Sequence, residues 1–407
     1  MTEKYTPNRE TPIATFFLHL IMMELLFFSG ESYYTTFLLG GGGKIRFVFL
    51  LTCMMHVYTS HKKFSPSRIN LRSLFFIVIW VLSCTYIFGQ GAHDLTWTSY
   101  VIFALGIFVV ASIVDFDRFR NLLLRYLVWL TIVSIIVQIG HDYLGIFPAQ
   151  MYIDSTGEPR YLSLGLFTTE WGENRLASFF WEPGQYQIVI LYVLVLFADE
   201  WSDITALRKS IRKFGVLIIA LIMTLSTTAY LMLGLVVLTI MIRGSQMYIK
   251  FIPVFLLLGV FATYSLYSSD AVQNKVEQSE NEAMESSYTI RLADNIGCLM
   301  VTLEDPLTGF GPGSDEMAER LLSEGSTSSS NGWLYGSAQL GIPYILFLWV
   351  CIWRNLKRVS HQTNRVLLFL ILLLSQANEA VIFFPYTFMY VFSFKRGIGN
   401  GTFKLNR

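Results

Sequence analysis

Residues 97–114 read WTSYVIFALGIFVVASIV, an apolar run without a charged side chain. Such a run is typical of a helix that crosses the hydrocarbon core of a membrane, which takes about 20 residues. Similar runs recur along the chain, at 71–89, 121–140, 186–198 with its flanks, 214–229, 251–267, 333–353 and 366–384. The sequence therefore predicts an all-α, polytopic integral membrane protein with roughly 10 to 12 spanning helices.

The composition agrees with a membrane protein. Of the 407 residues, 53% are hydrophobic and 14% are charged, whereas ordinary globular domains have about 25% charged residues. The four cysteines have neither the pairing pattern of a disulfide framework nor the spacing of a metal site. We expect no metal, no other cofactor and no nucleic-acid partner.

Basic residues indicate the topology. Of the 30 Lys and Arg residues, 23 lie in the two tails and in the loops at 60–72, 115–125, 200–213, 243–250 and 354–365. The positive-inside rule assigns these segments to the cytoplasm, so both termini are expected inside and the number of spans is even, about 12. Residues 366–394 are expected to supply two short spans broken near Gln-Ala-Asn-Glu at 376–379, with one long span as the alternative.

Two predicted external segments, 142–181 and 268–332, are too long for simple connections, since loops beyond about 15 residues are usually functional or disordered. The second contains 12 acidic residues and few basic ones. It is expected to contain short helices, one of them at 314–324 with Ser314 as its N-cap. We interpret residues 1–407 as one membrane domain whose two large external loops cover a cavity.

The segment 175–183, Arg-Leu-Ala-Ser-Phe-Phe-Trp-Glu-Pro, places a cation and a carboxylate at the start of an apolar span. Charges at a membrane boundary are costly and commonly mark function. Proline favours the first turn of a helix, so Glu182 is expected to cap a helix that opens at Pro183. Alternatively, Glu182 is a helix-start carboxylate favoured by the helix dipole, with Arg175 as its partner or a headgroup anchor.

A second candidate region combines Tyr288 and Arg291 with the later stretch Asp-Pro-Leu-Thr-Gly-Phe-Gly-Pro-Gly at 305–313. Glycines at alternate positions let the backbone approach another group closely. Their spacing fits neither a Walker motif nor a dinucleotide fingerprint, so nucleotide use is not expected. Arg291 either binds an anionic substrate or serves as a counter-ion for the acidic loop.

Asn331 and Tyr335 stand at the polar rim of the next apolar span. Aromatic residues are common at membrane interfaces whatever the function. Asn331 is therefore the more specific candidate of the two.

Taken in order, these segments resemble the O-antigen polymerase (Wzy) family, within the O-antigen ligase and polymerase group of membrane glycosyltransferases. The resemblance covers about a dozen spans and most of the chain. Its motifs are Arg-x-x-Ser-Phe-Phe-x-Glu-Pro at 175–183, Arg291 upstream of Pro-x-x-Gly-x-Gly at 306–311, and the segment from Asn331 to Gly341. The ligases of the group resemble one another in a His-Asn pair where this chain has Ser330-Asn331, which favours the polymerase branch.

The resemblance implies a GT-C-like fold in the bacterial inner membrane, with the active site on the external face. It implies undecaprenyl-diphosphate-linked oligosaccharides as donor and acceptor, membrane lipid as surroundings, and a chain-length regulator protein as a partner. The growing glycan would be transferred to the non-reducing end of an incoming unit, without a metal or a nucleotide sugar.

Chemistry assigns roles to the candidate residues in that reaction. Arg175 and Arg291 would stabilise the departing diphosphate, because guanidinium groups bind phosphate oxygens as planar, charged forks. Glu182 would accept the acceptor proton or orient Arg175. Substrate binding would fall to Tyr288, Asn331 and Tyr335.

Two alternatives remain open at this point, an O-antigen ligase and a flippase or transporter of lipid-linked oligosaccharide. A transporter is expected to show inverted repeats or a file of charges inside the membrane. In this sequence the charge is instead concentrated in the two external loops.

Overall fold

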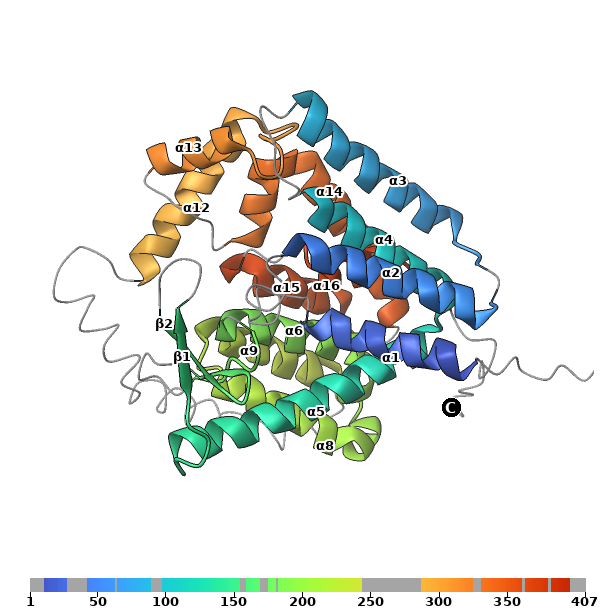
Figure 1. The fold of residues 1–407 in the computed structure, drawn as a ribbon, viewed down its shortest axis with the longest axis vertical. Coiled ribbons are helices and arrows are strands. Elements are labelled where there is room, and N and C mark those ends of the chain that lie inside the picture. Colours follow the sequence, from blue (N-terminus) through green and yellow to red (C-terminus); the bar gives the residue numbers. More distant parts are fainter. Residues whose placement is uncertain are drawn as a thin grey trace, which may run out of the picture.

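The computed structural model describes residues 11–27, 42–62, 64–88, 97–153, 159–168, 175–180, 182–243, 287–324, 331–360, 363–379 and 382–395. Helices dominate the architecture (Figure 1). The helices of the first half are α1 (Pro12–Phe27), α2 (Gly42–Ser60), α3 (Arg68–Ser83, extended by a π-helical turn at Cys84–Phe88), α4 (Trp97–Ile113), α5 (Phe116–Asp142), α6 (Pro183–Leu196) and α7 (Ala198–Trp201). Those of the second half are α8 (Ile204–Met223), α9 (Thr227–Arg243), α12 (Ser287–Glu304), α13 (Asp315–Ser323), α14 (Gly332–Val359), α15 (Arg365–Ser375) with a 3-10 turn at Gln376–Asn378, and α16 (Pro385–Val391).

The core of the bundle is built on α4 and α6, in which nearly every residue is buried. A helix that is apolar on all sides is stable only when other helices surround it. In contrast, α3 lies along the outer edge of the bundle and exposes large apolar side chains such as Phe75 and Ile79 (Figure 1). Among the described residues, three helices are long and apolar enough to cross a membrane, at Arg68–Phe88, Phe116–Asp142 and Gly332–Val359.

These observations confirm a helical protein with membrane-type helices. The predicted span at 251–267 lies outside the described residues, and the total of about 12 spans remains a prediction. The predicted span at 214–229 is wrong in its limits, because α8 ends at Met223 and α9 begins at Thr227. Leu225 between them has a left-handed backbone (φ 46°), and the Thr224 hydroxyl bonds the carbonyl of Leu221 at 2.7 Å.

The interruption predicted at 376–379 is confirmed, since α15 ends at Ser375 and α16 begins only at Pro385. The helix α15 has 11 residues and α16 has seven. At 1.5 Å per residue, neither is long enough to cross a hydrocarbon core of about 30 Å alone. The break therefore lies within the bundle, where Gln376 donates to the Tyr192 hydroxyl of α6 and, at 2.9 Å, to Thr387 of α16.

The loop 142–181 contains a small sheet that the all-α prediction missed. Its antiparallel strands, in the order β1 (Gln150–Ile153), β2 (Pro159–Ser163) and β3 (Leu166–Thr168), pair in register with Ser163 opposite Leu166. The two residues between them, Leu164 and Gly165, have positive φ values of 51° and 79°. Two positive φ values suit the tightest hairpins, which usually carry Asn-Gly or Asp-Gly. Leucine at the first position gave the sequence no such signal.

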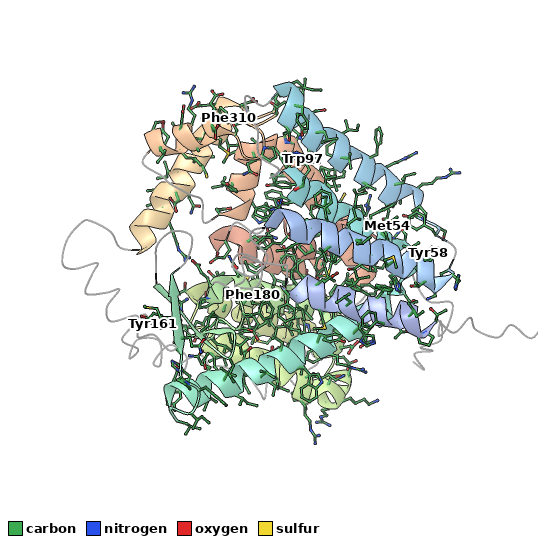
Figure 2. The ribbon with its side chains drawn as sticks, viewed as in Figure 1. Met54, Tyr58, Trp97, Tyr161, Phe180 and Phe310 are labelled. Atoms are coloured by element: carbon green, nitrogen blue, oxygen red, sulfur yellow. The ribbon has the colours of Figure 1, made fainter. Side chains whose placement is uncertain are left out.

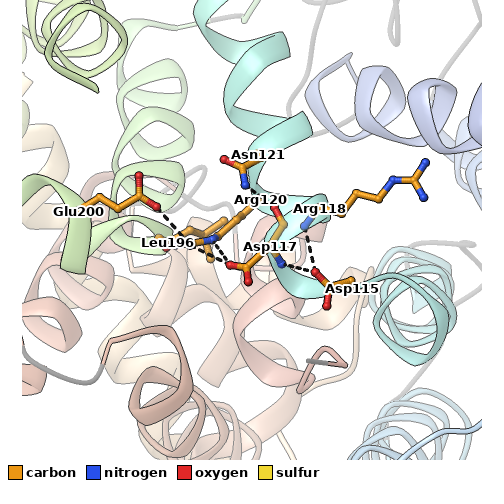
Figure 3. Close-up of polar contacts among 7 residues, drawn as sticks. All are labelled: Asp115, Asp117, Arg118, Arg120, Asn121, Leu196 and Glu200. Carbon is orange, nitrogen blue, oxygen red and sulfur yellow. Dashed lines mark hydrogen bonds and ion pairs between the residues drawn. The ribbon is translucent and has the colours of Figure 1, made fainter. Parts of the chain in front are cut away.

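A charged cluster fixes the other end of α6, far along the helix from Glu182 (Figure 3). Arg120 of α5 binds Asp117 at 2.8 Å and Glu200 at 3.2 Å, and it donates to the carbonyl of Leu196 at 3.1 Å. The same guanidinium lies 4.8 Å from the ring centre of Phe197. The 14 residues of α6 extend about 20 Å at 1.5 Å per residue, so this cluster anchors the helix and does not join the candidate site.

Candidate active site at the start of helix α6

The segment 175–180 is anchored in the interior of the protein. The Ser178 hydroxyl lies 2.7 Å from that of Ser134 in α5, and the Leu176 amide donates to the carbonyl of Met223 at 2.8 Å. Phe179 and Phe180 are fully buried, with ring centres 4.3 Å apart, and Figure 2 shows Phe180 among the helices of the bundle. Burial of this Ser-Phe-Phe sequence fixes the backbone that carries Arg175.

Arg175 reaches the break between α8 and α9. Its Nε donates to the carbonyl of Thr224 at 3.1 Å, and its charge acts on Tyr230 in the first turn of α9. A helix end leaves carbonyl groups without intrahelical partners, and a guanidinium satisfies them well. The orientation of Arg175 therefore depends on a helix break and not on a flexible loop.

Glu182 occupies the N-cap position of α6, as predicted, with extended backbone angles (φ −135°, ψ 148°) and Pro183 at the first helical position. Its side chain, however, makes no capping hydrogen bond. The carboxyl group is turned instead toward Glu379, with which it forms a side-chain hydrogen bond. The simpler interpretation of Glu182 as an ordinary cap therefore does not explain where its side chain points.

Glu379 was not among the predicted site residues. It follows the 3-10 turn that ends α15 and is 9% exposed. Its carboxyl group packs directly on Gly184, where a methyl group in place of hydrogen would overlap Oε1. The glycine of the Glu-Pro-Gly corner is therefore the residue that admits Glu379 to the start of α6.

Glu379 links the three predicted catalytic residues electrostatically: its carboxyl group forms a hydrogen bond with that of Glu182, and the charges of Arg291 and Arg175 act on it. The four residues come from different parts of the chain. Arg175 and the N-cap residue Glu182 precede α6, Arg291 lies in α12, and Glu379 follows the 3-10 turn after α15. A cluster of this kind combines two cations for an anion with a carboxyl pair for proton transfer.

Arg291 lies in the helix α12, although the sequence analysis placed it in a loop. Two interpretations of this arginine were open, and their contacts differ. A counter-ion of the acidic loop is expected to pair within that loop, as Arg320 does with Glu304 and Glu316, both at 3.6 Å. The charge of Arg291 acts on Glu379, which lies outside that loop. Most of the acidic loop precedes the described residues, so both interpretations of Arg291 stand.

The predicted binding residues lie in different surroundings. Tyr288 is in the first turn of α12, three residues before Arg291. Asn331 is the N-cap of α14, and its Oδ1 accepts hydrogen bonds from the amides of Trp333 at 3.0 Å and Leu334 at 3.2 Å. Tyr335 packs against the small apolar cluster of Cys298, Val301, Met317, Leu321 and Ala338. Asn331 and Tyr335 thus have clear structural roles.

The glycine-rich stretch serves the fold. Gly309 has φ 64°, and a methyl group there would lie 2.6 Å from the backbone of Gln339. The amides of Phe310 and Gly311 each donate at 2.9 Å to α14, to the carbonyls of Ala338 and Gln339. These amides are already bonded to protein, so the close approach predicted from the glycines is made to α14 and not to a phosphate.

A small cavity of about 10 Å³ lies between α6 and the chain that follows α15. Its lining includes Gln185 and Gln376, and the side-chain oxygens of both are buried without a hydrogen-bond partner among the described residues. Buried amide oxygens of this kind accept hydrogen bonds from hydroxyl groups. A volume of about 10 Å³ admits roughly one water molecule and is far too small for a sugar.

Searches against family models, curated proteins and solved structures found no match to this chain. The described residues contain no group of three or more His, Cys, Asp or Glu side chains that could hold a metal ion. The one signal for Glu379 in the sequence is a carboxylate inside an apolar run, which by itself marks a candidate functional residue in a membrane protein.

Proposed function

We propose that the protein polymerises undecaprenyl-diphosphate-linked oligosaccharide repeats on the outer face of the bacterial inner membrane. The observation that carries this proposal is that the buried carboxyl group of Glu379 packs on Gly184 at the start of α6, bonds that of Glu182 and lies in the field of Arg175 and Arg291. The order of motifs along the chain supports the same conclusion. The product would be O-antigen or a related surface polysaccharide.

The arginines suit the departing group. As the bond between the sugar and the diphosphate breaks, negative charge grows on the phosphate oxygens, and fixed cations stabilise that charge without reorganising. Arg175 and Arg291 supply two cations from separate elements, which is appropriate for a group with two phosphates. Glu182 would accept the proton of the attacking hydroxyl group, and Tyr288 would contact the substrate beside Arg291.

The surroundings of Arg291 suit the lipid part of the substrate. Helix α12 continues from Arg291 with exposed apolar side chains, at Leu292, Ile296, Leu299, Met300 and Leu303. A ligand with a diphosphate head and a long polyprenyl chain needs a cationic end and an apolar path next to each other.

Extracted lipid-linked material tests the proposal against its alternatives. Cells that lack the protein should keep single lipid-linked repeats and lose the longer ladder, because only chain growth is blocked. Loss of the surface glycan with full-length chains still attached to lipid would identify a ligase. Accumulation of repeats on the cytoplasmic face would identify a flippase.

Cysteine labelling tests the orientation. All four native cysteines are buried, so the unmodified protein should react little with a membrane-impermeant thiol reagent. A cysteine in place of the exposed Glu319 should react in intact cells, and one in place of the exposed Lys357 should react only after permeabilisation. The opposite pattern would place the site in the cytoplasm and contradict the proposed function.

A further inference from the structure

Two carboxyl groups in contact raise the question of where a proton resides. The Glu379 carboxyl group packs on Gly184, two residues after Glu182, and forms a side-chain hydrogen bond with the Glu182 carboxyl group. Two carboxylates in such contact do not both ionise readily. A carboxyl–carboxyl hydrogen bond also requires a proton on one partner, because an ionised carboxylate is only an acceptor. The pair therefore shares one proton.

The surroundings of the two side chains decide which of them is neutral. Glu379 is 9% exposed and packs on the backbone of Gly184, so ionising it would place a charge in the protein interior. Glu182 is only half-buried and stands at the N-terminal end of α6, where the helix dipole favours a negative charge. Among the described residues, the charged groups that act on Glu379 are Glu182 at the start of α6, Arg291 of α12 and Arg175 of the segment before α6.

We propose that Glu379 is a positioning residue that stays protonated and donates a hydrogen bond to the Glu182 carboxylate. The carboxyl pair then carries one negative charge, and the two arginines carry two positive charges. This inference rests on the proposed function and extends it. A second ionised carboxylate would cancel the remaining positive charge and weaken the attraction for a diphosphate. A neutral Glu379 also holds the Glu182 carboxylate in one orientation.

The reaction balances with Glu379 unchanged. The acceptor hydroxyl oxygen forms a bond to the anomeric carbon of the donor glycan, and the bond from that carbon to the diphosphate oxygen breaks. The bonding electrons leave with the polyprenyl diphosphate, next to Arg175 and Arg291. The hydroxyl proton passes to Glu182, which later releases it to solvent.

Replacing Glu379 by Gln tests this assignment, because glutamine is neutral at every pH and its amide can donate to Glu182. With purified protein and lipid-linked repeats, Glu379→Gln should keep at least about half of the wild-type turnover near neutral pH. Its activity should extend to higher pH than that of the wild type, because glutamine has no proton to lose. The wild type should lose activity as pH rises through the pKa of Glu379, since the group then becomes charged.

Two controls separate this role from a structural one. Glu379→Ala should lose turnover by about tenfold or more, since it removes the hydrogen-bond donor. Glu24→Gln is the matched change, because Glu24 is another buried carboxyl group, bonded by Thr52 at 2.8 Å in a different part of the bundle. It should leave the pH profile as it is. Loss of turnover in folded Glu379→Gln, with activity kept in Glu379→Asp, would show that Glu379 must ionise and would overturn the proposal.

Infrared spectroscopy gives a readout that does not depend on activity. A protonated carboxyl group has a carbonyl band that a carboxylate lacks, and wild type minus variant spectra at neutral pH should show this band for Glu379. A folded variant, either Glu379→Gln or Glu379→Ala, should lack this band. If the wild type minus variant spectrum shows no such band, Glu379 is not protonated and the assignment is refuted. A wild type that makes no polymer but shows the band would reject the proposed function and leave this assignment in place.

Discussion

Arg175→Lys is a sharp test of the site, because lysine keeps the charge and loses the fork. Arg175 donates its Nε to the carbonyl of Thr224 at 3.1 Å while its charge acts on Glu379. A single ammonium at the end of a flexible stem cannot hold the carbonyl and face the carboxyl pair through separate nitrogens. Lysine must therefore give up one of the two contacts.

The expected loss follows from the contact that is removed. A hydrogen bond that involves a charged group contributes about 1.5–3 kcal/mol, which corresponds to a factor of roughly 10 to 100 in rate or affinity. We expect kcat/KM for polymer formation to fall by that factor, with the thermal midpoint of the protein nearly unchanged. The assay uses purified protein in a lipid disc with a lipid-linked repeat as substrate, and ladder length is read on a gel.

Arg320→Lys is the control for this change. Arg320 lies in α13, is half exposed and pairs with Glu304 and Glu316 at 3.6 Å. Surface pairs of this kind contribute about 1 kcal/mol or less, and lysine can replace arginine in them. Its turnover should equal that of the wild type. If Arg175→Lys also keeps wild-type turnover within about twofold, the fork at Arg175 has no role and the reasoning from its geometry is wrong.

Three further predictions follow from the same geometry. Arg291→Lys should be nearly as damaging as Arg291→Ala, because a diphosphate site uses the planar fork; a fully active lysine variant at normal protein level would restore the counter-ion interpretation. Gly341→Ala should destabilise the protein by about 2 kcal/mol or more, because φ is 76° and a methyl group would overlap a backbone carbonyl. Gly234 has open space around it, so Gly234→Ala should not destabilise the protein, and melting curves of the two variants test the difference. Polymer formation should persist in chelator, and loss of activity that magnesium or calcium restores would reveal a metal requirement.

Local features of the fold could be predicted from the sequence because neighbouring residues determine them. Pro183 fixes the start of α6, and Ser314 caps α13 by accepting from the amide of Met317 at 3.4 Å. The polar residues at 376–379 end α15 as expected. The hairpin at Leu164 was missed for the opposite reason, because its turn does not have the Asn-Gly or Asp-Gly pair that usually marks a tight hairpin.

The composition of the site could be predicted only in part. Arg175, Glu182 and Arg291 were found because charges are conspicuous at membrane boundaries. Their common partner Glu379 lies about 200 residues after Glu182, and only the packing of α15 on α6 brings the two together. The partner of the glycine-rich stretch was unpredictable for the same reason, since Gly309 contacts a kink in α14 that is visible only in the fold.

Breaks in the helices explain why the site lies where it does. Irregular backbone is costly in a bilayer and persists only where protein surrounds it or where it lines a cavity. The break after α8 supplies the carbonyl of Thr224 that orients Arg175, and the break after α15 delivers Glu379 to the start of α6. The kink at Gly341 receives the chain that follows α12, where the Ile342 amide donates to the carbonyl of Pro306 at 2.8 Å, and so secures the helix that carries Arg291. Each interruption therefore supports one charged member of the cluster, and a substitution that restores continuous helix at any of the three should remove activity before it unfolds the bundle.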